Sequence, residues 1–241
     1  MNELSVQLYS VRDAFATDPT RTLARLADIG FTRVEPYGVL ENRDVLRTGL
    51  AEHGLTAPTV HAKLLGADQH AVFAAAAELG IGTVIEPMVE QARWQRPGDI
   101  ASELNAAAAL ATGHGVTVGY HNHWWELVER VDGRHALEVF AEHLDPAVVL
   151  EVDTYWTTAG GADTPALLTA FGDKVHAIHV KDGGLATDGS GQVPAGQGRV
   201  PLAEILAAAP DALRVIEFDR YDGDIFDGLA ASFARLNGAA E

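Results

Sequence analysis

The chain has 241 residues, 47% of them hydrophobic, and a formal net charge of -17. This length suits one large core, and α/β barrels commonly reach it as a single domain. The negative charge argues against nucleic acid as a partner, because affinity for a phosphate backbone comes mainly from Lys and Arg. No cysteine is present, so any metal would be held by oxygen and imidazole donors.

The hydropathy pattern also bears on membranes and location. No apolar run is long enough to cross a bilayer, and no signal-peptide pattern precedes the first strand-like segment. We therefore expect a cytoplasmic protein that acts on a small molecule, with neither membrane nor nucleic acid as a partner. The sequence leaves the oligomeric state open, and a homo-oligomer is compatible with it.

Eight strand-type runs alternate with amphipathic or Ala-rich stretches of helical period. Strict alternation with short connections predicts a parallel sheet, and eight units predict closure into a (β/α)8 TIM barrel. We expect this barrel to form one domain over residues 1–241. A Gly-rich segment, 183–198, is expected to be either a flexible loop or a lid. The predicted strands span residues 4–9, 33–36, 56–61, 82–86, 116–121, 147–153, 175–180 and 213–218.

Ionisable residues gather at the C-terminal ends of the later strands. Asp153, His179 and Glu217 lie at or near the ends of three consecutive strands, and a buried carboxylate without a partner is strongly unfavourable. A divalent cation would supply that partner, with Glu126 after the fifth strand as the best fourth donor. Each residue alone would more readily be a satisfied polar group, but four in adjacent units favour a metal site.

Other ionisable residues could move protons. A metal that chelates a carbonyl and a neighbouring hydroxyl stabilises an enediolate, and a base must lie close to the reacting carbon. The candidate bases are Glu35, Glu86, His121 and His123. For Glu35 the alternative is a salt bridge at the rim, for Glu86 an ion pair, and at least one of the two histidines is expected to be a hydrogen-bonded core residue.

Substrate contacts are predicted from the same strand ends. Lys181 could donate to a substrate oxygen, although an ion pair with Asp182 or Asp153 is the commoner role, and His61 could bind a sugar hydroxyl or be purely structural. Asp219 shares a face with Glu217. Aromatic faces pack against sugar C–H groups, and four aromatic residues follow the fifth and sixth strands. We expect at least one of these four to line the pocket: Trp124, Trp125, Tyr155 and Trp156.

Several segments resemble the sugar phosphate isomerase/epimerase family, which has the xylose isomerase-like barrel. They are VQLYSVRD, GFTRVEPYG, GYHNHWWE, LEVDTYWTTAGG, VHAIHVKDG, PAGQGRV and VIEFDRYD, and the resemblance covers essentially the whole chain. It implies one divalent ion, most often Mn²⁺, with Mg²⁺, Co²⁺ or Zn²⁺ as other options. Carried over by position, the ligands would be Glu126, Asp153, His179 and Glu217.

The chain departs from the epimerase branch near the fifth strand. That branch has a second Glu for proton transfer there, whereas this chain offers His121 and His123, so the strand-five ligand could be a histidine.

The resemblance and the residues together predict the reaction class. We expect a metal-dependent sugar or cyclitol isomerase or epimerase that works through an enediolate. The absence of an Arg and Lys cluster at the predicted rim favours an unphosphorylated substrate. The alternative is a lyase or dehydratase that acts on a keto-sugar or inositol derivative at the same site. Less favoured are an apurinic endonuclease-like hydrolase, which the net charge opposes, and a non-catalytic sugar-binding barrel.

Overall fold

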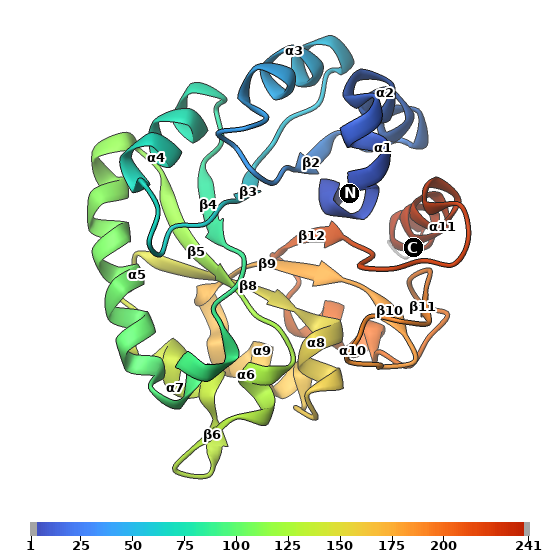
Figure 1. Cartoon of the computed structure of the whole chain (residues 1–241). Coiled ribbons are helices and arrows are strands. Elements are labelled where there is room, and N and C mark those ends of the chain that lie inside the picture. The colour runs from blue at the N-terminus through green and yellow to red at the C-terminus, as the bar shows by residue number, and fades with distance from the viewer. Residues whose placement is uncertain (1–3, 239–241) are drawn as a thin grey trace.

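The computed structural model describes residues 4–238 as a barrel of parallel strands surrounded by helices (Figure 1). Eight strands are paired in the order β2-β1-β12-β9-β8-β5-β4-β3. Isolated parallel bridges from Arg33 to Thr56 and from Tyr37 to His61 close the circle between β2 and β3. The predicted (β/α)8 barrel is confirmed. Its strands are β1 (Leu4–Gln7), β2 (Arg33–Glu35), β3 (Thr59–His61), β4 (Thr83–Glu86), β5 (Thr117–His121), β8 (Val148–Asp153), β9 (Val175–Val180) and β12 (Leu213–Ile216).

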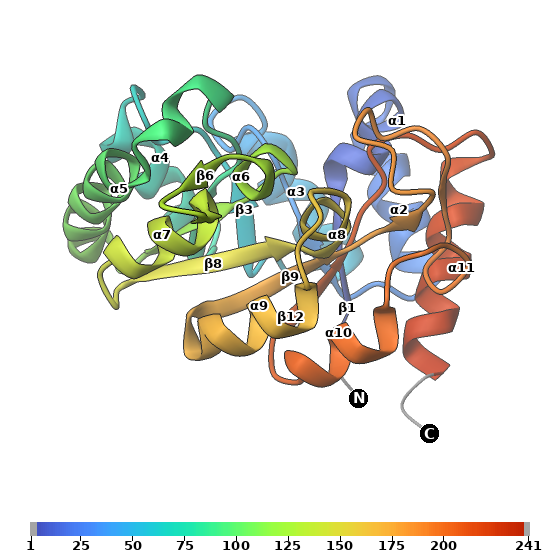
Figure 2. The ribbon, with the colours of Figure 1, turned by 90° about the horizontal axis from the view of Figure 1, so that it is seen from below.

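The helices form an outer layer, and α9 and α10 lie outside β8, β9 and β12 in both views (Figures 1 and 2). None of the helices among residues 4–238 combines the length and hydropathy needed to cross a membrane. The α-helices are α1 (Arg12–Thr17), α2 (Pro19–Ile29), α3 (Arg43–His53), α4 (Gln69–Glu78), α5 (Pro97–Ala111), α6 (Trp125–Val128), α7 (Ala136–His143), α8 (Thr154–Ala159), α9 (Thr164–Phe171), α10 (Leu202–Ala208) and α11 (Ile225–Gly238). Four 3-10 turns are η1 (Leu8–Val11), η2 (Gln91–Gln95), η3 (Thr112–His114) and η4 (Gly172–Lys174).

Local sequence signals set the ends of the helices. In α2, the Asp18 carboxylate accepts a hydrogen bond from the Arg21 backbone N–H, and Pro19 occupies the first turn, where its missing N–H carries no penalty. Gly30 ends the helix with a φ of 117°, a conformation that an L side chain rarely adopts. Asp68 and Asp163 cap α4 and α9 in the same way as Asp18.

Alternation along the strands separates an apolar layer from a polar one. Val34, Val60, Val84 and Val118 are fully buried and belong to the hydrophobic core. Neighbours such as Glu35, Thr59 and Thr83 are buried polar groups instead, because successive side chains point to opposite faces of a strand. The polar set therefore fills the barrel interior and must find partners there. It includes Ser5, Gln7, Glu35, Thr59, Thr83, His121, Glu151, Asp153 and His179.

Two short hairpins add to the predicted elements. One pairs β6 (Arg130–Val131) with β7 (Arg134–His135), and the other pairs β10 (Asp182–Gly183) with β11 (Gln192–Val193). The second hairpin lies within the Gly-rich segment, which folds around the buried Asp182 carboxylate. That carboxylate accepts four backbone N–H groups, so the segment has a defined fold; its movement as a lid stays a prediction. The donors are Gly183, Gly196, Gly198 and Val200.

Candidate active site and metal centre

The register of three neighbouring strands brings ionisable side chains together. His121 on β5 lies beside Glu151 on β8, and Asp153 on β8 lies beside His179 on β9. The second pairing depends on an irregularity between Leu150 and Glu151: Leu150 pairs with Val175 and Glu151 with Ala177, so one residue of β9 is skipped. Regular pairing from Leu150 onward would instead place Ile178 next to Asp153. A local bulge thus puts an imidazole next to a carboxylate.

Two overlapping groups of donors could each hold a metal ion. The rim group consists of His121, Asp153, His179 and Glu217, and the deep group consists of His61, His121, Glu151 and His179. Within each group, one donor atom from every residue lies within 4.8 Å of the others. The rim group offers two imidazoles and two carboxylates, and the deep group offers three imidazoles and one carboxylate. Both donor sets suit divalent transition metals.

The rim group is linked through the Lys181 ammonium. Its Nζ lies 2.6 Å from Glu217 Oε2, 2.9 Å from Asp153 Oδ2 and 2.9 Å from Asp219 Oδ2. Burial alone would lower the pKa of Lys181, but these carboxylates raise it well above its ordinary value. Burial would likewise raise the pKa of Glu217, but Lys181 and His179 hold it well below the ordinary range. Lys181 is therefore a cation and Glu217 an anion at neutral pH.

Asp153 is less strongly compensated. Its burial raises the pKa to about 6 against the opposing effect of Lys181. One oxygen accepts the Trp156 backbone N–H at 2.8 Å, whereas the other makes no hydrogen bond of regular geometry. This second oxygen is the one that faces Lys181 and His121.

The deep group is centred on Glu151. Its Oε2 lies 2.5 Å from His61 Nε2, 3.1 Å from His179 Nε2 and 3.3 Å from His121 Nδ1. Burial would raise the pKa of Glu151, but His179 and His61 lower it well below the ordinary value. Burial would lower the pKa of His179, and Glu151, Glu217 and Glu35 raise it well above normal. His121 differs, because burial and the neighbouring His179 keep its pKa well below the ordinary value.

Unpaired atoms and excess negative charge make the cluster suitable for a cation. Glu151 Oε1 is buried without a hydrogen-bond partner among the described residues, a costly condition for a polar atom. The five carboxylates of the cluster outnumber its cations, Lys181 and His179. The carboxylates are Glu35, Glu151, Asp153, Glu217 and Asp219.

Glu126 belongs to neither donor group. It lies in α6, where its carboxylate accepts the Tyr120 hydroxyl at 2.7 Å and the His123 backbone N–H at 3.0 Å. Burial raises its pKa to about 8, although the bond from Tyr120 opposes the shift. These contacts account for both carboxylate oxygens, and Glu126 as a metal ligand stays a prediction.

Two of the candidate bases are engaged away from the cavity. Glu35 is fully buried and accepts the Gln7 side-chain amide at 2.7 Å, with His179 Nε2 at 2.8 Å from the same oxygen. Glu86 accepts the backbone N–H groups of Leu64 and Leu65 at 2.7 and 2.8 Å. Neither carboxylate lines the cavity described below. Glu35 supports the imidazoles from beneath, and Glu86 holds the connection after β3.

His123 is the candidate base with the most open surroundings. Its ring stacks on Trp125 at a centroid distance of 4.3 Å, and its Nδ1 has no hydrogen-bond partner within residues 4–238. Burial and the Lys181 charge lower its pKa to about 3. The imidazole is therefore neutral at pH 7.

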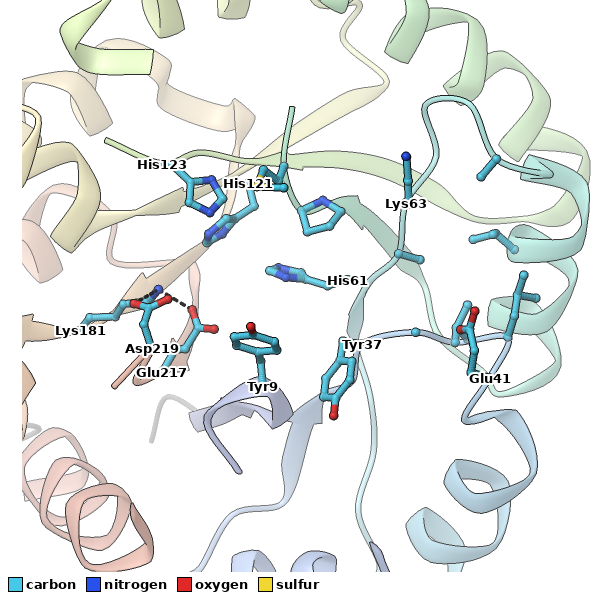
Figure 3. Close-up of a pocket in the computed structure, with 18 residues that line it drawn as sticks. Tyr9, Tyr37, Glu41, His61, Lys63, His121, His123, Lys181, Glu217 and Asp219 are labelled. Atoms are coloured by element: carbon cyan, nitrogen blue, oxygen red, sulfur yellow. Dashed lines mark hydrogen bonds and ion pairs between the residues drawn. The ribbon is translucent and has the colours of Figure 1, made fainter. Parts of the chain in front are cut away.

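A cavity of about 660 Å³ opens directly above the rim group (Figure 3). At one end it is lined by His121, His123, Lys181, Glu217 and Asp219, with His61 near the middle. At the other end it extends over the β2–α3 and β3–α4 connections as far as Glu41 and Lys63 (Figure 3). Six of the residues proposed from sequence thus share one cavity wall.

The four predicted aromatics lie outside this wall. Trp125 and Trp156 flank His123, at centroid distances of 4.3 and 6.4 Å; Trp124 packs against Trp125, and the Tyr155 hydroxyl donates to the Ala186 carbonyl. Their contact with substrate stays a prediction. The aromatic residues that line the cavity are Tyr9 and Tyr37.

Sequence reasoning did not single out several residues of the site. Glu151 shares the inward face of β8 with Asp153, and this alternation could have identified it. Tyr37, Leu40 and Met88 lie on connections, where no periodic pattern indicates which way a side chain points.

Comparison with known proteins places the chain among related barrels. A family model described as a xylose isomerase-like TIM barrel matches residues 23–213. A sugar phosphate isomerase/epimerase from Parabacteroides distasonis has a similar structure, with a TM-score of 0.85, 20% identity, and coverage of 100% of this chain and 95% of that one. None of the curated proteins matches the sequence.

Two further solved structures are similar over 98% of this chain. One is a probable 3-DHS dehydratase from Bacillus anthracis, with a TM-score of 0.75, 17% identity and 98% of that chain covered. The other is the IOLI protein with a bound zinc atom, with a TM-score of 0.69, 16% identity and 96% of that chain covered. At these identities the likeness establishes the fold.

Proposed function

The chain belongs to the xylose isomerase-like TIM barrel family, and from this premise we propose that it is a metal-dependent isomerase or epimerase of a sugar or cyclitol. The observation that carries the proposal is the rim group. Its donors converge within 4.8 Å, and two of them, His121 and Glu217, also line the cavity. An ion held there would be within reach of a bound substrate.

We assign the metal to His121, Asp153, His179 and Glu217, with His121 in the strand-five position in place of Glu126. The deep group has a single carboxylate, Glu151, which is fully buried, does not line the cavity and already binds imidazole nitrogens. Glu151 and Glu35 therefore act on the metal indirectly, since a carboxylate that binds one nitrogen of a histidine fixes the ring for ligation by the other. The donor set is compatible with Mn²⁺ or Zn²⁺.

A bound divalent ion would act as a Lewis acid toward the carbonyl and neighbouring oxygen of the substrate. Proton removal from the hydroxyl-bearing carbon next to the carbonyl needs a neutral base that faces the cavity. His123 is neutral and lines the cavity. When Asp153 and Glu217 bind a cation, Lys181 keeps Asp219 as its partner and has N–H groups free for a substrate oxygen. His123 thus moves the proton, and Lys181 stabilises negative charge on oxygen.

A dehydratase is the second candidate, because it would begin with the same proton removal. The similarity of fold to the probable dehydratase from B. anthracis is the reason to consider this reaction. In that case Lys181, held as a cation beside Asp219, would donate its proton to the departing hydroxyl. The two reactions differ in whether water is lost.

The proposal is tested by solvent exchange. Metal-loaded protein is incubated with a panel of keto-sugars and inosose derivatives in deuterated water, and mass spectrometry and NMR follow label and product. We expect deuterium at the carbon next to the carbonyl, with either an isomeric product or loss of water. Absence of both exchange and turnover across the panel, with stoichiometric metal bound, would contradict the proposal.

A further inference from the structure

The cavity is also lined by apolar residues from the connections after β2, β3 and β4 and from α4, which we name the apolar arm: Tyr37, Val39, Leu40, Ala62, Val72 and Met88. We propose that the apolar arm binds a hydrophobic substituent of the substrate, so that the substrate is a sugar or cyclitol carrying an alkyl or aryl group. This inference rests on the proposed function for the polar end of the same cavity. It adds the chemical class of the part of the substrate that does not react.

The size of the cavity is the first argument. A water molecule takes about 30 Å³ of liquid volume, so 660 Å³ corresponds to roughly 22 such volumes. A hexose has only twelve non-hydrogen atoms, and bonded atoms pack more closely than separate waters. One ring above His121 and Glu217 therefore leaves about half of the cavity for another group.

The second argument is the distribution of exposed apolar side chains. Six large hydrophobic residues are exposed within residues 4–238, and three of them line this cavity: Tyr9 at 45%, Leu40 at 43% and Met88 at 53% relative accessibility. Scattered exposed apolar residues are ordinary, but a concentration at one cavity indicates a ligand that removes them from water. An alkyl or aryl group would do so.

The third argument is the scarcity of polar partners in the apolar arm. Glu41 and Lys63 are the charged residues on these connections that line the cavity, and Figure 3 shows both on the opposite side of His61 from Lys181 and Glu217. Sugar hydroxyls buried without hydrogen bonds are costly. A second sugar ring would suffer this penalty against the apolar side chains of the arm, whereas a hydrophobic group would not.

The walls of the apolar arm are also fixed in place. The Gly38 N–H donates to the His61 carbonyl, and the Asn42 side-chain amide donates to the Tyr37 carbonyl. In the connection after β3, the Glu86 carboxylate accepts the backbone N–H groups of Leu64 and Leu65. The apolar arm is thus preformed, as expected of a ligand pocket.

The test measures binding rather than turnover, with glucosides that have no free carbonyl and cannot react. Calorimetry compares methyl, butyl, hexyl and phenyl β-D-glucopyranosides with cellobiose on the metal-loaded protein. Each buried methylene should tighten binding about fourfold, so affinity should rise by at least tenfold from methyl to hexyl or phenyl. Cellobiose should bind no better than the methyl glucoside.

Variants locate the effect in the apolar arm. Leu40→Gln and Met88→Gln should remove most of the gain in affinity with chain length. Leu110→Gln is the matched control, because Leu110 has the same 43% exposure as Leu40 and does not line the cavity. The variants should fold normally, since all three side chains are exposed.

Several results would overturn the inference. One is equal affinity for all the glucosides, including no binding by any of them; another is a gain that persists in Leu40→Gln and Met88→Gln. Preference for cellobiose would indicate a disaccharide site instead, and self-association abolished by Leu40→Gln would indicate a second copy of the chain. If any of these results is found but small keto-sugars still exchange deuterium with solvent, the proposed function is supported and only the inference about the apolar arm fails.

Discussion

The two ends of the cavity are built from different parts of the fold. The polar end stands on β5, β8, β9 and β12, and strand register fixes its side chains to one another, as in the pairing of Asp153 with His179. The apolar arm stands on the connections after β2, β3 and β4 and on Val72 of α4. Rigid strands suit a reaction that depends on exact geometry, and loops can change without disturbing it. Substitutions at the polar end should therefore alter metal binding and turnover, and those in the apolar arm should alter substrate preference.

The largest effect is expected at Glu217, which would link the metal and the cavity. Glu217→Gln should lose stoichiometric metal and turnover together, because a neutral amide is a much weaker donor for a divalent ion than a carboxylate. Elemental analysis and activity measure the two losses. Glu204→Gln on the exposed side of α10 is the control and should change neither. A Glu217→Gln protein that keeps one ion per chain with unchanged affinity would remove Glu217 from the ligand set.

The next effect separates proton transfer from metal binding. His123→Asn should keep the metal and slow turnover by roughly 10²- to 10⁴-fold, the usual contribution of a general base. The rate of deuterium exchange should fall in parallel. Loss of the metal would make His123 a ligand, and unchanged turnover would assign the base elsewhere.

A smaller effect on metal affinity is expected at Glu151, which contacts the proposed histidine ligands. Glu151→Gln should weaken metal affinity by about 10- to 100-fold, because Glu151 orients the imidazoles of His121 and His179. Competition with a chelator measures the change. Ser5→Ala, a buried change at a hydroxyl without a hydrogen-bond partner, should have little effect. Equal losses in both variants would indicate general damage to the barrel interior.

The smallest effect on function is expected for a substitution of Glu126, which should instead change the stability of the folded protein. Its pKa is about 8 in the folded protein and near 4.5 when unfolded, so the folded state holds the proton more tightly. Stability from this group is complete below about pH 4.5 and is lost as the pH rises to 8. Glu126→Gln, which imitates the protonated form, should therefore gain stability over the original chain by a few kcal/mol between pH 5 and pH 8.

Denaturant unfolding across this pH range measures that gain, and metal content should stay at one ion per chain. A constant difference at all pH values would mean that Glu126 is ionised in the folded state. Loss of the metal would instead indicate that Glu126, and not His121, is the strand-five ligand.

The strand pattern in the sequence predicted most residues of the polar end, but it could not predict the residues of the apolar arm. Alternation and strand ends placed Asp153, His179 and Glu217 on inward faces because periodicity 2 is a property of the backbone itself. The role of Glu126 could not be read in this way, since whether it reaches a metal or Tyr120 depends on the short helix α6. The turns that carry Leu40 and Met88 follow no period, so their gathering at one cavity appears only in three dimensions.

The most direct test of the account is a crystal structure of the protein soaked with Zn²⁺, with anomalous scattering measured at the zinc edge. We expect one peak per chain, about 2.0–2.2 Å from one donor atom of each member of the rim group, with His121 as the strand-five ligand. A peak bound by Glu126, a peak held between His61 and Glu151, or no peak at saturating zinc would contradict the central claim.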